Sequence, residues 1–373
     1  MSGNRDTLRT IIEESDHAVT MPDGSRLSAR LWRPEDAEAD PVPLILEFLP
    51  YRKRDGTCAR DALTHPYLAA RGYACARVDL RGTGDSEGLM EDEYSAQELA
   101  DAVAVIEWAA SQPWCNGAVG MMGISWGGFN SLQVAALAPD ALKAIITLCS
   151  TVDRFADDIH YKGGCLLTEN LGWGATMWSY SSRAPDPALR ENWREMWLER
   201  LEAEPFLPSV WLRHQRRDAY WQRGSVCEDF SAIKAKVLAV GGWGDAYKNA
   251  VPQLVEALEG AKGIVGPWVH KYPHFAVPEP RIGFLQEALR WWDRWLKGID
   301  TGVEDDPDYR VYLMDGVRPA AWYSERSGRW IAEKTGATTH LPVQTLHLGT
   351  GGTLSDMPQM IHSTVASPAH CGR

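Results

Sequence analysis

The chain has 373 residues, of which 45% are hydrophobic and 24% charged, so its composition indicates neither wholesale disorder nor a membrane protein. A formal net charge of −12 opposes non-specific binding to nucleic acid or anionic lipid, and we expect no nucleic-acid or membrane partner. The first twenty residues lack the apolar core of a secretion signal and the seven cysteines include no C-x-x-C pair, which predicts a cytoplasmic protein with reduced thiols.

The N-terminal part of the chain is predicted to form a hairpin followed by alternating strands and helices. The hairpin comprises residues 17–21 and 25–32 on either side of the turn Pro22-Asp23-Gly24. Short apolar segments predict strands at 43–50, 73–80, 118–123 and 142–150. Ser95 and Glu98 form a capping box that starts one helix, and a second helix follows residue 126. Such alternation predicts an α/β fold with a mostly parallel sheet and helices on both faces.

The rest of the chain first interrupts this pattern and then resumes it. Residues 151–230 contain several helical pieces rich in Trp and Arg, which predict a helical cap inserted into the fold. Strands at 236–242 and 262–266 and amphipathic helices after each of them continue the core through residues 231–300. From 307 to 373 the strand pattern predicts the beginning of an all-β domain, which is too short for a full sandwich. The first part of the core is residues 1–150.

The strongest chemical signal is Gly123-Ile124-Ser125-Trp126-Gly127, which fits G-x-S-x-G and lies between a predicted strand and a predicted helix. The glycines permit a sharp turn that lifts the serine hydroxyl above the sheet, and the backbone N–H of Trp126 then faces the developing oxyanion. This context predicts that Ser125 is a catalytic nucleophile. The competing interpretation is a glycine-rich turn that happens to contain a serine.

A serine nucleophile needs a histidine base and a carboxylate that orients it, and in this fold the chain order is Ser, acid, His. His270 follows the strand 262–266 at the expected sheet edge, with His274 as the alternative base. Asp245 is the first carboxylate after the strand 236–242, although it could instead cap the next helix. Two other carboxylates, Asp218 and Asp229, precede that strand and fit less well.

Six segments together resemble the cocaine-esterase and X-prolyl dipeptidyl-peptidase family (CocE/NonD type) of serine hydrolases. They are MPDGSRLSARLWRP, FLPYRK, VDLRGTGDSEG, GMMGISWGG, VGGWGDAY and GPWVH, in that order. The resemblance implies an α/β-hydrolase fold with a helical cap and a C-terminal jelly roll, and a chain that stops short of a complete jelly roll. It also implies a second oxyanion donor, a tyrosine hydroxyl at Tyr51; the other interpretation of Tyr51 is a packed residue at the rim.

The sequence therefore predicts a serine esterase or acylase that forms an acyl-enzyme and needs no cofactor or metal. An alternative is an X-Pro dipeptidyl-peptidase or α-amino acid ester hydrolase, which would need a carboxylate to bind the free amino group. Asp157 and Asp158 are candidates for that role, although an acidic run more often forms a solvated face. An alternative of another class is a catalytically silent binding protein on the same fold. The partner expected is a small ester, amide or short peptide; the sequence leaves the acyl group and the oligomeric state open.

Overall fold

The computed structural model describes residues 8–334 and 344–358. The chain divides into two compact units after residue 335. In the second unit, two short antiparallel strands flank a single 3₁₀ turn: β13 (His347–Leu348), η4 (Thr350–Gly352) and β14 (Leu354–Ser355). The candidate catalytic residues all belong to the first unit, which contains one large sheet.

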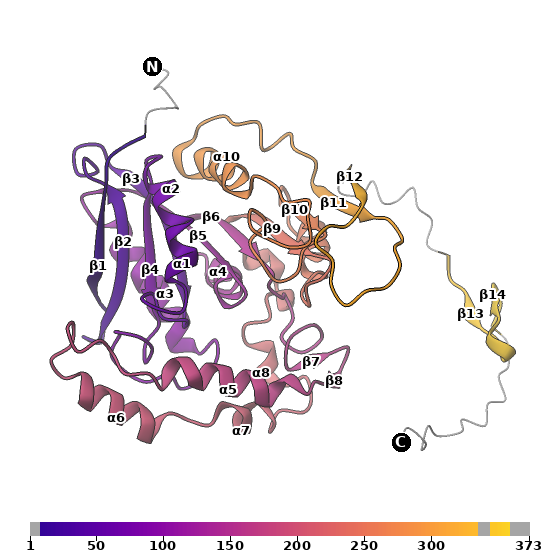
Figure 1. Cartoon of the computed structure of the whole chain (residues 1–373), viewed down its shortest axis with the longest axis horizontal. Helices are drawn as coiled ribbons and strands as arrows, with labels where there is room; N and C mark the ends of the chain where they lie inside the picture. The colour runs from indigo at the N-terminus through magenta and orange to yellow at the C-terminus, as the bar shows by residue number, and fades with distance from the viewer. Residues whose placement is uncertain (1–7, 335–343, 359–373) are drawn as a thin grey trace. The chain divides into compact units, whose positions relative to one another are not determined.

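Ten strands form this sheet, and Figure 1 shows them side by side from β1 to β12. In spatial order they are β1 (Ile11–Thr20), β2 (Arg26–Pro34), β4 (Ala74–Asp79), β3 (Val42–Leu49), β5 (Cys115–Ile124), β6 (Leu142–Leu148), β9 (Lys236–Gly242), β10 (Lys262–Gly266), β11 (Tyr309–Met314) and β12 (Gly328–Glu333). Neighbouring strands from β4 to β11 are parallel, whereas β1, β2 and β12 pair in the antiparallel sense. The mostly parallel sheet predicted from the sequence is confirmed.

Alternating side chains of the central strands enter two separate hydrophobic cores. In β3, Leu44 and Leu46 belong to one core, whereas Ile45 between them belongs to the other. This alternation is what a strand buried on both faces requires, because successive side chains point to opposite sides. The segment is therefore a continuous apolar run.

Helices cover both faces of the sheet. The first core is closed by α3 (Ala96–Ala110), α4 (Trp126–Ala136) and α9 (Ala250–Ala257), and the second by α2 (His65–Ala69) and α10 (Phe284–Lys297). A short helix, α1 (Cys58–Ala62), precedes α2. At the start of α3 the hydroxyl of Ser95 accepts a hydrogen bond of 3.1 Å from the N–H of Glu98, so this half of the predicted capping box is confirmed.

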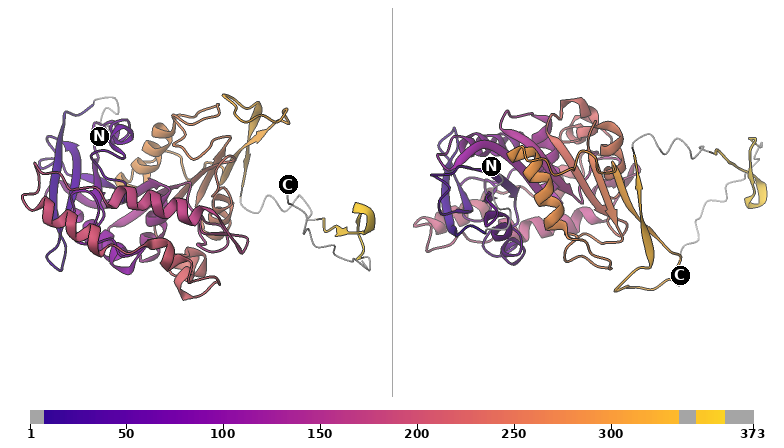
Figure 2. Two further views of the ribbon diagram at one scale, coloured as in Figure 1. Left: turned by 60° about the horizontal axis from the view of Figure 1, so that its bottom comes forward. Right: turned by 90° about the horizontal axis from the view of Figure 1, so that it is seen from above.

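Residues 151–235 leave the sheet after β6 and return to it at β9. This segment, which we call the cap, contains β7 (Tyr161–Lys162), β8 (Cys165–Leu166), α5 (Glu169–Ser181), α6 (Trp193–Ala203), α7 (Leu207–Trp211), α8 (Ala219–Gln222), η1 (Val226–Glu228) and η2 (Phe230–Ala232). Its helices run along one end of the sheet in Figure 1 and come toward the viewer in the left view of Figure 2. The chain therefore places a helical layer next to the strand ends where the candidate residues lie.

Strands β11 and β12 fall within the segment 307–373, for which a β domain is predicted. In the structure they extend the core sheet, because β11 pairs in parallel with β10 and β12 pairs with β11. Pairing with β10 satisfies the backbone groups that would otherwise be open at the edge of the core. Among the described helices, none combines the length and the apolar character that crossing a membrane requires.

Candidate active site

The turn between β5 and α4 holds Ser125 in a strained backbone conformation. Its φ of 57° and ψ of −125° lie outside the regions that residues with a side chain normally occupy. A Cβ at Gly123 would lie 2.6 Å from the Cα of Gly127, so this close approach requires glycine at position 123. The N–H of Ser125 donates to the carbonyl of Leu148 on β6, at 2.9 Å, which fixes the turn to the sheet. The sharp turn expected from the glycines is present.

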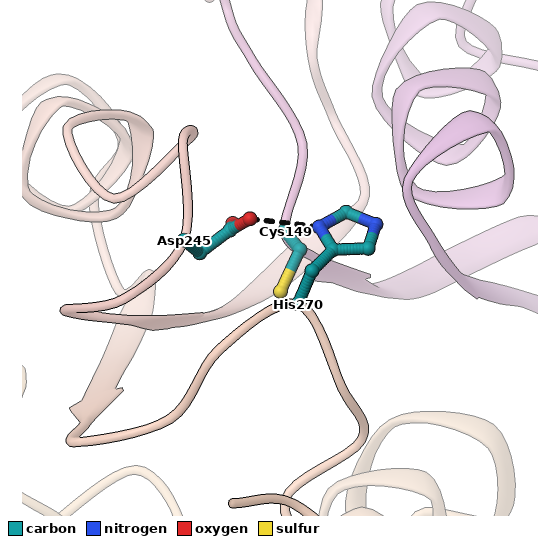
Figure 3. Close-up of side chains that lie close together, drawn as sticks. All are labelled: Cys149, Asp245 and His270. Atoms are coloured by element: carbon teal, nitrogen blue, oxygen red, sulfur yellow. Dashed lines mark hydrogen bonds and ion pairs between the residues drawn. The ribbon is translucent and has the colours of Figure 1, made fainter. Parts of the chain in front are cut away.

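Two loops from neighbouring strands bring His270 and Asp245 together. The Nδ1 atom of His270 lies 2.7 Å from Oδ1 of Asp245, which follows β9, while His270 follows β10 (Figure 3). The Asp245 side chain is 2% exposed, whereas the His270 side chain is 42% exposed. A buried acid that binds one nitrogen of a partly exposed imidazole leaves the other nitrogen available for proton transfer.

A third side chain, that of Cys149, lies next to this pair. Cys149 directly follows β6, and its sulfur lies beside Asp245 and His270 (Figure 3). Burial and the neighbouring Asp245 carboxylate raise the pKa of the Cys149 thiol well above its ordinary value. The thiol therefore stays protonated and contributes a weak donor next to the carboxylate. The sequence does not predict this contact, because no residue pattern around position 149 indicates that the end of β6 lies next to Asp245.

The alternatives considered for the histidine and the acid lie elsewhere. His274 stacks on Phe284 with ring centroids 5.8 Å apart, and neither of its ring nitrogens has a hydrogen-bond partner in the described residues. Burial lowers the pKa of His274 to about 4. Asp218 and Asp229 cap α8 and η2, respectively. The residue that precedes α9 as its cap is Asn249, so Asp245 does not have that structural role.

Tyr51 and Trp126 flank Ser125. Tyr51 follows β3, packs edge-on against the Trp126 ring at 6.5 Å and lines the same pocket as Ser125. Burial raises the pKa of the Tyr51 phenol well above its ordinary value, although the neighbouring Ser125 opposes this shift. The phenol therefore remains a hydrogen-bond donor at neutral pH.

The indole of Trp126 is held by a buried carboxyl group. Its Nε1–H donates to Oε1 of Glu98 at 2.6 Å, and the side-chain amide of Asn130 donates to the same oxygen at 2.8 Å. Burial raises the pKa of Glu98 to about 7 even though both hydrogen bonds favour the charged form. Trp126, the residue directly after Ser125, is thus anchored to a group that titrates near neutral pH.

We expect Glu98→Gln to stabilise the protein at alkaline pH and to have little effect below pH 5. Folded Glu98 binds its proton more tightly than the unfolded chain, so the free energy of unfolding falls as pH rises from about 4.5 to about 7. Glutamine retains a carbonyl acceptor and has no such pH dependence, which gives an advantage of up to about 3 kcal/mol at pH 8. Urea unfolding of both proteins at pH 5 and pH 8 measures this difference. An equal difference at the two pH values would contradict the assignment.

A pocket of about 460 Å³ opens at Ser125 and His270. Three of its residues, Trp173, Thr176 and Tyr180, come from the cap helix α5, where spacings of three and four place them on one helix face. Tyr51 and Phe275 add two further aromatic rings. The pocket is therefore mostly apolar and aromatic, with the candidate nucleophile at its wall.

The acidic run of the cap does not line this pocket. Asp157 forms an ion pair with Lys162, and Asp158 is only 2% exposed. Burial raises the pKa of Asp158 to about 6. The expectation that this run forms a solvated face is wrong, because the cap folds over it and the N–H of Ile159 binds Asp158 at 2.7 Å.

Behind the pocket wall lies a buried ionic cluster that the sequence did not reveal. Glu93 is contacted by Arg154 at 3.0 Å and His160 at 2.7 Å, and the indole N–H of Trp173 donates to its other oxygen at 2.8 Å. Burial alone would raise the pKa of Glu93, but His160 and Arg154 lower it to about 2. Cap and core are joined here by residues more than sixty positions apart, and no local sequence signal predicts that contact.

A second buried cluster lies under the pocket and is balanced without a metal ion. Glu47, Asp61 and His65 converge there, but Arg60 and Arg77 approach the two carboxylates at 2.7 and 3.5 Å. Burial alone would raise the pKa of Glu47, whereas Arg60 and His65 lower it to about 2. The two arginines supply the positive charge that a cation would otherwise bring.

Comparison with known proteins identifies relatives over most of the chain. A family model described as X-Pro dipeptidyl-peptidase (S15 family) matches residues 23–272. The cocaine esterase of Rhodococcus sp. (strain MB1 Bresler) is 29% identical over an alignment of 335 positions, gaps included, that covers 80% of this chain and 58% of that protein. The chain thus spans little more than half the length of this curated relative.

Solved structures show the same fold at low sequence identity. A CocE/NonD family hydrolase from Staphylococcus aureus superposes with a TM-score of 0.69 at 22% identity, covering 86% of this chain and 56% of that one. An α-amino acid ester hydrolase gives a TM-score of 0.63 at 19% identity, covering 96% and 64% of the two chains. The predicted α/β-hydrolase fold is confirmed.

Proposed function

The chain belongs to the X-Pro dipeptidyl-peptidase (S15) family, and we propose that it is a serine hydrolase that cleaves ester or amide bonds of small acyl substrates. One observation carries this proposal: Ser125 lies on a strained strand-to-helix turn at the wall of an apolar pocket that also contains His270, which is bound to the buried Asp245. We assign the constrained serine as the nucleophile and the partly exposed imidazole as its base. The buried acid is the group that orients the base.

In the proposed mechanism Ser125 Oγ attacks the substrate carbonyl carbon while Nε2 of His270 takes the hydroxyl proton. The carbonyl π electrons move to oxygen, and the tetrahedral intermediate collapses as His270 returns the proton to the leaving alcohol or amine. Water then attacks the acyl-enzyme by the same route, which releases the acid and regenerates Ser125. Asp245 keeps the imidazole in one tautomer and stabilises its protonated form.

The negative oxygen of the intermediate would be bound by two donors. These are the hydroxyl of Tyr51 and the backbone N–H of Trp126 at the start of α4. Donors of this kind, fixed before the reaction in a site with little water, favour the transition state over the ground state. The packing of both rings against each other and the Glu98 anchor support this role.

The peptidase alternative takes its support from the family model and needs a carboxylate for the substrate α-ammonium. Asp157 and Asp158 are the candidates, and neither lines the pocket. Asp157 is paired with Lys162, and Asp158 is buried in the cap. We therefore favour an esterase or acylase over release of X-Pro dipeptides or cleavage of α-amino acid esters.

A fluorophosphonate probe tests catalysis directly against the silent-binding alternative. We expect it to label the wild-type protein at Ser125, because only a serine activated by its histidine attacks phosphorus at a useful rate. Peptide mapping locates the adduct, and Ser125→Ala is the matched blank. Failure to label the folded wild-type protein, judged by circular dichroism, would favour a binding protein.

A further inference from the structure

The charged residues that line the pocket are both cationic. They are Arg60 and Lys271, and the lining, all of it within the described residues, includes no carboxylate. This contrasts with the chain as a whole, whose formal net charge is −12. The overall negative charge of the protein would repel an anion. A pocket lined by cations therefore indicates that the site itself prefers an anionic substrate.

Arg60 is held in place from the side opposite the pocket. Its Nη2 donates to Glu47 Oε1 at 2.7 Å and to Asp61 Oδ1 at 3.1 Å, and its guanidinium lies 5.4 Å from the Tyr272 ring centroid. In the described part of the chain, Nη1 has no hydrogen-bond or ion-pair partner, and it is not among the fully buried atoms. The guanidinium is therefore preorganised, with one terminal nitrogen left to bind a ligand.

Lys271 supplies a second cation on the wall that carries the candidate base. It lies between His270 and Tyr272, its side chain is exposed, and it takes part in no ion pair within the described residues. The guanidinium of Arg183 lies 5.7 Å from the ring centroid of Tyr180, but it is paired with Asp55 at 3.2 Å and does not line the pocket. Among the described residues, Lys271 is therefore a cation of the pocket lining that no carboxylate neutralises.

Three buried carboxylates near the pocket are already paired with cations. Glu93, behind Trp173, is bound by Arg154, His160 and the indole itself. Glu47 and Asp61, under Arg60, face two arginines. A substrate ammonium would meet no carboxylate among the lining residues, whereas a substrate carboxylate would meet N–H donors of Arg60 and Lys271 for charge-assisted hydrogen bonds.

We propose that the pocket selects esters or amides that combine an apolar body with a carboxylate, such as half esters of dicarboxylic acids. This inference rests on the proposed hydrolase function and adds its substrate class. The aromatic rings of Trp173, Tyr180 and Phe275 bind the apolar body, while Arg60 and Lys271 bind the carboxylate. The attraction between the substrate carboxylate and these two side chains decreases as ionic strength rises.

The test compares two substrates of equal chain length, the mono-4-nitrophenyl ester of glutaric acid and 4-nitrophenyl pentanoate. They differ only in a terminal carboxylate against a methyl group and release the same nitrophenolate. We expect kcat/KM for the glutarate ester to be about tenfold higher or more at low salt. The ratio should fall as salt is added. L-alanine 4-nitroanilide, which carries a free ammonium, should be a poor substrate.

The series Lys271→Gln and Lys271→Glu removes and then reverses one charge without disturbing the buried Arg60 cluster. The ratio of the two kcat/KM values should fall stepwise, several-fold for each change. Lys234→Gln and Lys234→Glu are matched controls, because Lys234 is exposed on the loop before β9 and outside the pocket. They should leave the ratio unchanged.

The charge preference can fail while the hydrolase function on which it rests stands, and the experiments distinguish the two failures. If the pentanoate ester is cleaved in a Ser125-dependent manner as fast as the glutarate ester, the hydrolase proposal stands and the charge preference is overturned. The same holds if the Lys271 and Lys234 series change the ratio equally. If neither ester is cleaved and the fluorophosphonate does not label Ser125, the hydrolase function fails and the inference fails with it.

Discussion

Ser125→Ala and His270→Ala should each lower kcat for 4-nitrophenyl esters by about a millionfold while leaving the fold intact. Residues that transfer one proton between them act as a unit, so removing either one eliminates nearly the whole contribution. The alanine at position 125 leaves a void of a single oxygen atom, and His270 is partly exposed, so neither change should unfold the chain. Steady-state kinetics together with circular dichroism measure both quantities.

His274→Ala is the control for this prediction. It removes a buried ring that stacks on Phe284 and contacts Phe275, so it should reduce stability more than it reduces turnover. Activity retained in His270→Ala and lost in a folded His274→Ala protein would reassign the base to His274. Comparable turnover in Ser125→Ala would remove the nucleophile assignment.

Tyr51→Phe should lower kcat by about a hundredfold to a thousandfold with little change in KM. The substitution preserves the ring that packs against Trp126 and removes only the hydroxyl that would bind the oxyanion. An interaction made mainly in the transition state affects kcat rather than ground-state binding. Initial-rate measurements over a range of ester concentrations separate the two parameters.

Tyr94→Phe is a matched control, since Tyr94 packs on Trp126 at 4.7 Å and does not line the pocket. The variant removes a phenolic oxygen from another ring that packs against Trp126, and it should change kcat by no more than a few-fold. Equal losses in the two variants would indicate that Tyr51 acts through packing around Trp126 rather than through its hydroxyl.

Local signals in the sequence predict much of the fold and the centre of the candidate site. Apolar runs such as 43–50 and 73–80 become β3 and β4, because a strand with helices on both faces must be apolar on both. The glycines around Ser125 constrain the turn from within five residues. Chain order alone then points to Asp245 and His270, and the structure brings these two side chains together.

The remaining features depend on partners that are far away in the sequence. Whether Asp158 is exposed or buried is decided by how the cap folds, and nothing in the run from 153 to 160 reveals it. Glu93 is buried behind the pocket wall by contacts with Trp173 and His160, which are far from it in the sequence. Arg60 faces the pocket because Glu47 and Asp61 bind it from beneath. Charged residues are normally exposed, so their burial is the property that local patterns predict least well.

The end of the described core also depends on partners that the local sequence does not identify. Alternating residues after 307 correctly indicate strands, but periodicity does not say which edge a strand joins. The open side of β10 accepts β11 in parallel, and the hairpin to β12 follows. Strand partners are determined by the three-dimensional arrangement of edges rather than by the composition of the segment.

The face of α5 that carries Trp173, Thr176 and Tyr180 allows the pocket to change independently of the candidate catalytic residues. These three positions shape the pocket, whereas Ser125, Asp245 and His270 are held by loops at the ends of sheet strands. Substitutions on α5 can therefore alter which acyl groups fit the pocket, while Ser125, Asp245 and His270 keep their positions. Thr176 and Tyr180 are therefore the positions at which natural or laboratory selection can change the specificity. Trp173 is the constrained member of the set, because its indole also holds the cap to Glu93.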